Sequence, residues 1–141
     1  MLDSAVETID TQRGQSERSY IKSGNCQISF IDFGNHEKPS LIMIHGMRDH
    51  GMSLVEIGEA LSSDFRVIAV DLRGHGRSDN PGIYTMVHFV ADVRAVAEHC
   101  QLEKPVVIGH SLGGHVASRY AAVFADDISK LVLLDGMGPP T

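Results

Sequence analysis

The chain has 141 residues with a formal net charge of -6, and hydrophobic residues make up 43% of it. This length suits one domain with its own core, and an acidic balance without a Lys/Arg patch argues against nucleic acid or an acidic membrane as partner. Cys26 and Cys100 lack C-x-x-C spacing, so they predict free thiols in a reducing compartment, and no Cys/His set has zinc-ligand spacing. Without an apolar run of membrane-spanning length or a signal-peptide pattern, we expect a cytoplasmic protein.

The amino-terminal part divides into a polar segment and a hairpin. Residues 1–18 are polar and acidic, which predicts a flexible tail ahead of a globular portion over residues 19–141. Gln27–Phe33 alternates apolar and polar residues and predicts an outer antiparallel strand. It is expected to pair with Ser19–Lys22 across the turn at Ser23–Asn25.

Two buried parallel strands and two helices are predicted next. Leu41–Ile44 and Arg66–Asp71 are short apolar runs, typical of strands covered on both faces. Between them, Leu54, Ile57 and Leu61 recur at helical spacing and predict a helix. We expect these three side chains to pack in the core. A longer helix over residues 86–100 follows, with Thr85 as its N-cap. Its apolar face comprises Phe89, Val90, Val93, Val96 and Ala97.

The most informative segment is the apolar run Val106–Ile108, which leads directly into Gly109-His110-Ser111-Leu112-Gly113. A strand followed by G-x-S-x-G and a helix, here residues 114–125, is the pattern that presents a nucleophilic serine on a sharp turn. Ser111 is expected at positive φ, where Gly109 and Gly113 leave room for neighbouring backbone. The pattern predicts that Ser111 is a nucleophile.

A serine hydrolase also needs donors for the oxyanion that develops on the substrate carbonyl. His45-Gly46-Met47 follows the strand Leu41–Ile44, and Gly46 allows a close approach. We expect the backbone N–H groups of Met47 and Leu112 to form this oxyanion hole.

The three segments together resemble the α/β-hydrolase superfamily: H-G at residues 45–46, D-L-R-G-H-G-R-S-D at 71–79 and G-H-S-L-G-G at 109–114. The resemblance implies an α/β fold with a doubly wound, mostly parallel sheet. It implies hydrolysis of an ester or related acyl bond in a small-molecule substrate, without cofactor or metal. A serine rather than an aspartate argues against the dehalogenase and epoxide-hydrolase relatives. The charged loop at 71–79 is expected to be a hydrogen-bonded scaffold, not a catalytic cluster.

The same resemblance implies that part of the family's machinery lies outside this chain. The family sheet has eight strands and its catalytic histidine follows the last one, whereas Lys130–Asp135 matches the sixth. We therefore expect a sheet truncated after about six strands, without the histidine-bearing part. All eight histidines precede that part, and none is expected to replace the base. They are His36, His45, His50, His75, His88, His99, His110 and His115.

Two questions stay open from the sequence. Asp135 stands where some members of the family take their catalytic acid, but most take it from strand seven, and Asp135 is expected to be a strand-end residue. The second hypothesis for the chain is a catalytically silent truncated form or pseudoenzyme that acts by association. It would self-associate through the open edge of its sheet.

Overall fold

The computed structural model describes residues 6–11 and 14–135, whose strands form one seven-stranded sheet in the order β1-β2-β3-β5-β4-β6-β7. The fold class expected from the sequence, an α/β fold with a doubly wound sheet, is confirmed. The sheet was expected to be mostly parallel and is mixed, because three of its six described strand pairings are antiparallel. The strands are β1 (Glu7–Thr11), β2 (Gly14–Ser23), β3 (Cys26–Asp32), β4 (Ser40–Ile44), β5 (Arg66–Val70), β6 (Val106–His110) and β7 (Lys130–Leu134). The α-helices are α1 (Val55–Leu61), α2 (Met86–His99) and α3 (Leu112–Val123), and short 3₁₀ turns span Gly51–Leu54 and Ala125–Asp127.

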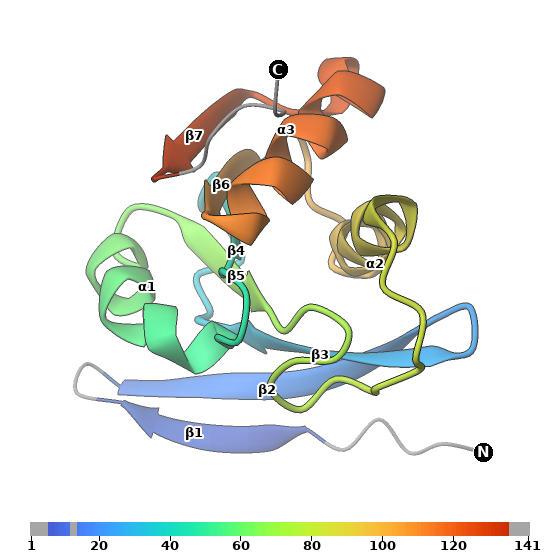
Figure 1. Cartoon of the computed structure of the whole chain (residues 1–141). Helices are drawn as coiled ribbons and strands as arrows, with labels where there is room; N and C mark the ends of the chain where they lie inside the picture. The colour runs from blue at the N-terminus through green and yellow to red at the C-terminus, as the bar shows by residue number, and fades with distance from the viewer. Residues whose placement is uncertain (1–5, 12–13, 136–141) are drawn as a thin grey trace.

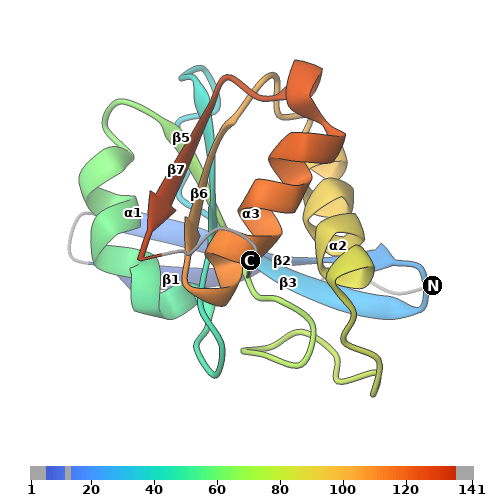
Figure 2. The ribbon, with the colours of Figure 1, turned by 45° about the horizontal axis from the view of Figure 1, so that its top comes forward.

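The sheet has a parallel half and an antiparallel half. Strands β5, β4, β6 and β7 run parallel, whereas β1, β2 and β3 pair antiparallel, and β3 joins the halves by pairing with β5. Helix α1 lies on one face of the sheet, and α2 and α3 lie on the other, with α3 against β6 and β7 and α2 against β2 and β3 (Figures 1 and 2). The carboxyl ends of β4, β5, β6 and β7 therefore meet along one edge of the molecule, where ligands bind in open α/β sheets.

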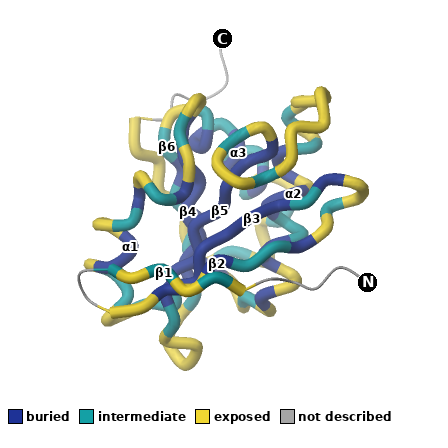
Figure 3. The backbone as a smooth tube through the Cα atoms, turned by 90° about the horizontal axis from the view of Figure 1, so that it is seen from below, coloured by how far each residue is buried: buried dark blue, intermediate teal, exposed yellow. Residues whose placement is uncertain are grey.

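The core consists of two layers, one on each face of the sheet. In Figure 3, β3, β4 and β5 run through the buried centre of the molecule. Ile42, Ile44 and Ile68 face α2 and α3, whereas Leu41 and Met43 face α1. A strand buried on both faces has no polar side, which explains the continuous apolar runs of β4 and β5.

The amino-terminal segment differs from the flexible tail expected over residues 1–18. Glu7–Thr11 forms β1, one strand more than the six expected, and β2 already begins at Gly14. The physical reason is strand pairing: β2 pairs with β3 from Glu17 onward, and β1 pairs with the first half of β2. A buried ion pair adds to this, because Arg18, 4% exposed, donates from a guanidinium nitrogen to Asp71 Oδ2 at 2.7 Å. This contact attaches β2 to the end of β5. Residues 1–5 and 12–13 lie outside the described part of the chain.

The two helices before β6 test the predicted apolar faces. Thr85 caps α2 as expected, because its side chain accepts a hydrogen bond from the His88 N–H, and the predicted face of α2 is buried. For α1 the prediction was wrong in part, since Ile57 is 43% exposed. Gly58 instead faces the sheet, where a Cβ would lie 2.6 Å from the Phe33 ring, so the helix approaches β3 too closely for a side chain at that position.

Strand β7 forms one edge of the sheet and is exposed on both faces. It pairs with β6 only, and its four apolar residues, Leu131 to Leu134, keep 37–40% of their surface accessible among the described residues. An edge strand with this much apolar surface is a template for association.

Candidate active site

Ser111 occupies a one-residue turn between β6, which ends at His110, and α3, which begins at Leu112. Its backbone has φ 54° and ψ -115°, and its side chain is exposed. Such a conformation costs about 1–3 kcal/mol for a residue with a Cβ and persists only where the surroundings impose it. The positive φ expected from the motif is therefore present.

Gly109 and Gly113, which flank the serine turn, occupy positions where a side chain would not fit. A Cβ on Gly109 would overlap the carbonyl of Gly113, and a Cβ on Gly113 would overlap the carbonyl oxygen of Ile44 at the end of β4. The start of α3 thus rests directly on the backbone of β4. On the other side, the Ser111 N–H donates to the Leu134 carbonyl at 3.2 Å, so β7 also holds the turn.

The loop after β4 lies beside Ser111, as the oxyanion hole requires. A Cβ on Gly46 would be 3.2 Å from Ser111 Cβ and 3.3 Å from His110 Nδ1, so only glycine lets the loop come this close comfortably. Within the described chain, the N–H groups of Met47 and Leu112 donate to no acceptor. Leu112 belongs to the first turn of α3, whose N–H groups have no intrahelical partner and carry the positive end of the helix dipole. Both predicted donors thus belong to segments next to Ser111, and neither has an acceptor within residues 6–11 and 14–135.

His45 is the one fully buried histidine among the described residues, with 0% of its surface exposed. Its Nδ1 lies 2.7 Å from the Gly46 carbonyl oxygen, and its Nε2 accepts the Leu72 N–H at 3.0 Å. Burial is the main reason that the pKa of His45 lies below its usual value, so the ring is neutral near pH 7. The sequence indicated only a turn residue here, because its contact with Leu72 spans 27 positions.

The structure brings no base to Ser111 within residues 6–11 and 14–135. The other histidines are exposed or half-buried, and no histidine ring in this part of the chain hydrogen-bonds to the Ser111 hydroxyl. His110 comes nearest in sequence, and its ring lies against Gly46. The expectation that none of them replaces the family's base stays a prediction.

Asp135 directly follows β7, whose last residue, Leu134, bonds to the Ser111 backbone. It is exposed and has φ 49°, a left-handed conformation that aspartate tolerates better than most residues. It therefore lies at the same edge of the sheet as the serine turn, at the place where a strand-six acid would stand.

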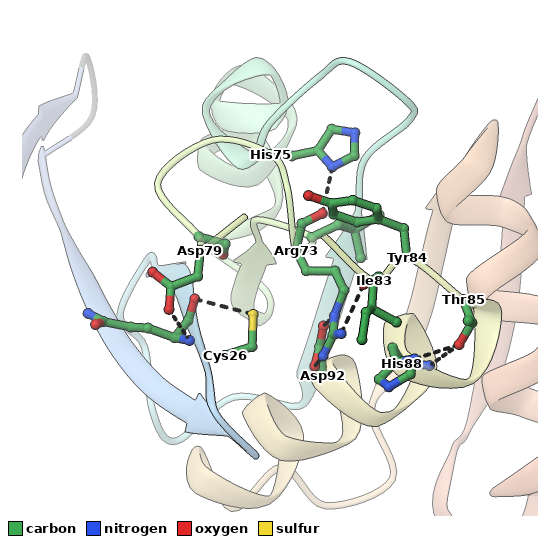
Figure 4. Close-up of polar contacts among 12 residues, drawn as sticks. Cys26, Arg73, His75, Asp79, Ile83, Tyr84, Thr85, His88 and Asp92 are labelled. Carbon is green, nitrogen blue, oxygen red and sulfur yellow. Dashed lines mark hydrogen bonds and ion pairs between the residues drawn. The ribbon is translucent and has the colours of Figure 1, made fainter. Parts of the chain in front are cut away.

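The charged loop after β5 forms a network of buried contacts (Figure 4). Arg73 donates from Nε and a terminal nitrogen to both carboxylate oxygens of Asp92 on α2, at 2.6 and 2.8 Å, and also to the Ile83 carbonyl at 3.1 Å. Asp71 accepts the Gly51 N–H at 2.7 Å in addition to Arg18. These contacts fix the loops around the serine edge, which agrees with the scaffold expected from the sequence.

No group of three or more His, Cys, Asp or Glu side chains that could hold a metal ion occurs in the described part of the chain. Both cysteines are buried and free, and burial raises the pKa of Cys100 to about 12, so its thiol stays protonated.

A cavity of about 530 Å³ lies between the end of α2 and α3, near Leu102 and Tyr120. Since the segment before β6 lines it, it opens at the amino ends of the strands, away from Ser111. No helix in the described ranges is long and apolar enough to cross a membrane.

Comparison with known proteins gives consistent matches. The family described as "alpha/beta hydrolase fold" matches residues 39–141. The chain is 36% identical over 106 residues to the serine hydrolase-like protein of Mus musculus, covering 73% of this chain and 34% of that protein. It is 37% identical over 123 residues to the AB hydrolase superfamily protein YisY of Bacillus subtilis, covering 85% of this chain and 46% of YisY. The solved thioesterase domain from the curacin biosynthetic pathway superposes with a TM-score of 0.81 at 30% identity, covering 89% of this chain and 48% of that one. The chain thus spans a third to about half of the length of these relatives.

Proposed function

This chain belongs to the α/β-hydrolase fold family, and from that premise we propose that it carries the nucleophile and oxyanion hole of a serine hydrolase. Its substrate class is a small molecule with an ester or related acyl bond. The observation that carries the proposal is the backbone of Ser111 at φ 54°, with the Gly46 loop packed against it. A strained serine, next to two N–H groups that have no acceptor among the described residues, supports nucleophilic catalysis better than a structural turn.

The proposed chemistry follows from that arrangement. Ser111 Oγ attacks the acyl carbon and its proton passes to the general base, while the electron pair of the C=O π bond moves onto the carbonyl oxygen, which becomes negative in the tetrahedral intermediate. The N–H groups of Met47 and Leu112 donate to this oxygen, and the positive end of α3 adds to the stabilisation. Donors that are fixed before the reaction need no reorganisation when the charge develops, and one such donor is worth about 10²–10³ in rate.

For the general base we propose that none of the eight histidines of this chain serves. We propose that the base is a histidine of the family's later segment, and that its orienting acid comes from strand seven rather than from Asp135. Without a base the serine hydroxyl stays protonated, so we propose low reactivity for the isolated chain. Serine enzymes stripped of triad members keep about 10³–10⁴ of rate over water from the oxyanion hole and binding.

A second function is favoured by a separate observation, the exposed edge strand β7. Leu131 to Leu134 are 37–40% exposed on both faces of the sheet edge. A catalytically silent form that associates through this edge is the alternative proposal. It requires no reactivity at Ser111, so one experiment separates the two functions.

That experiment is labelling of the full chain with a fluorophosphonate, followed by identification of the modified residue by mass spectrometry. The serine oxygen forms a bond to phosphorus, fluoride leaves, and the hydroxyl proton passes to water. We expect slow labelling confined to Ser111 and abolished by Ser111→Ala. The matched control is Ser118→Ala, which removes a serine of the same helix that only back-bonds to the Gly114 carbonyl.

Three outcomes are distinguishable. Slow labelling at Ser111 alone supports the nucleophile. No labelling above that of Ser111→Ala would refute it and favour the silent form. Rapid stoichiometric labelling at Ser111 would show that one of the eight histidines serves as base, against the proposal that the base lies in a later segment.

A further inference from the structure

The Gly46–Met47 peptide group has two ends with different partners. Its carbonyl oxygen, on Gly46, lies 2.7 Å from Nδ1 of His45, and its N–H, on Met47, has no acceptor in the described chain. The described part of the chain contains no cis peptide bond, so the C=O and N–H of this peptide point in opposite directions. Whatever fixes the carbonyl therefore also fixes where the Met47 N–H points.

The proton on the His45 ring can be placed from its two contacts. The Leu72 N–H is a donor at 3.0 Å, so Nε2 must be the unprotonated acceptor. The proton of the neutral ring is then on Nδ1, which donates to the Gly46 carbonyl. A ring that is completely buried keeps both contacts away from competing water.

The strand order indicates in which direction the clamp points, that is, the pair of hydrogen bonds that the His45 ring makes with Leu72 and Gly46. β4 lies between β5 and β6, Leu72 lies just beyond the end of β5, and Ser111 directly follows β6. His45 therefore reaches toward the β5 side, where it holds the Gly46 carbonyl. A Gly46 carbonyl held on that side would leave the opposite end of the same peptide, the Met47 N–H, to face the β6 side, where Ser111 stands.

We propose that His45 is a positioning residue that sets the orientation of the Gly46–Met47 peptide, so that the Met47 N–H faces the oxyanion site. The inference rests on the proposed function in one respect, the use of that N–H as an oxyanion donor. Gly46 has no side chain to resist rotation of the peptide, so the loop itself does not select the orientation. The bond from His45 does.

Two substitutions separate the clamp from the general packing of the ring. In His45→Asn the amide nitrogen takes the place of Nδ1 and can still donate to the Gly46 carbonyl. In His45→Gln the amide oxygen takes the place of Nε2 and can still accept from Leu72, but no donor remains for Gly46. Each variant loses ring volume and one hydrogen bond, so a purely structural role would affect both alike.

Fluorophosphonate labelling of Ser111 in the full chain gives the first measurement. His45→Gln should label about 10² more slowly than the wild type, because an oxyanion donor is lost, and His45→Asn should stay within a few-fold. Equal losses in the two variants, or no loss in His45→Gln, would overturn the proposal.

A second measurement needs neither reactivity nor a variant. The ¹⁵N shifts of the His45 ring in the wild-type chain should show a protonated Nδ1 and an unprotonated Nε2, and a proton on Nε2 would overturn the proposal.

If the wild type itself does not label, the proposed nucleophile fails, while the ring shifts and the Gly46 carbonyl ¹³C shift in the two variants still decide the role of His45. That carbonyl shift should move in His45→Gln and stay near the wild-type value in His45→Asn.

Discussion

Removing the carboxylate of Asp92 should destabilise the fold by several kcal/mol. Asp92 is 0% exposed and accepts two hydrogen bonds from Arg73, whose side chain is 6% exposed. In Asp92→Ala the guanidinium keeps only the Ile83 carbonyl at 3.1 Å and remains buried with its charge uncompensated. Breaking a buried pair in this way costs about 3–5 kcal/mol, a large fraction of the 5–15 kcal/mol that stabilises a typical domain.

The assay is urea unfolding at constant pH, in which the shift of the midpoint multiplied by the slope gives the change in free energy of unfolding. Glu98→Ala is the matched control on the same helix. Its partner Arg94 is 28% exposed and Glu98 63% exposed, so this pair should contribute no more than about 0.5 kcal/mol. If Asp92→Ala costs less than about 1 kcal/mol, or no more than Glu98→Ala, the claim that the Arg73 network holds the loops at the serine edge is refuted.

Four further outcomes are expected. Gly113→Ala should lower the free energy of unfolding by about 1–3 kcal/mol in the same urea assay, because its Cβ overlaps the Ile44 carbonyl oxygen, and an unchanged midpoint would contradict this. Because the pKa of His45 is lowered in the folded chain, the unfolded chain takes up the proton first as the pH falls. The neutral His45 ring therefore contributes its full stability above about pH 6.5, and this contribution is lost as the pH falls toward the folded-state pKa. The urea midpoint of the wild type should fall more steeply from pH 7 to 5 than that of His45→Asn. Leu133→Lys should reduce self-association, measured by sedimentation, and should reduce the binding of a hydrophobic dye. A wild-type chain that is a compact monomer and binds no dye would contradict the association of chains through β7. In a protein completed with a related carboxyl-terminal half, Asp135→Asn should leave kcat/KM nearly unchanged, whereas a loss near 10⁴ would make Asp135 the triad acid.

Local signals in the sequence were sufficient for the continuous apolar strands and for the amino-terminal cap of α2. The apolar runs of β4, β5, β6 and β7 and the Thr85 cap of α2 each depend on neighbouring residues, so a single sequence predicts them. The strands β1 and the first half of β2 were missed because their residues are polar. Their order comes from pairing and from the contact between Arg18 and Asp71, 53 positions apart.

The same division holds for the candidate site. The turn at Ser111 is encoded within five residues, so its positive φ could be predicted. The contacts of His45 that hold the loop at Gly46 and Met47 could not be predicted, because they require His45 and Leu72, at the ends of two neighbouring strands, to meet in space. The exposure of Ile57 was missed for a related reason, since spacing alone does not say which side of α1 the sheet will meet.

The bond between the Ser111 N–H and the Leu134 carbonyl makes the serine turn dependent on an exposed edge strand of the sheet. Edge strands open locally at a much lower free energy than central ones. If β7 separated from β6, the turn would lose this restraint, and the serine backbone could relax to an unstrained conformation. A ligand or chain segment that covers the outer side of β7 would suppress this opening, and so would raise the fraction of time that Ser111 is held in its strained conformation without touching the serine.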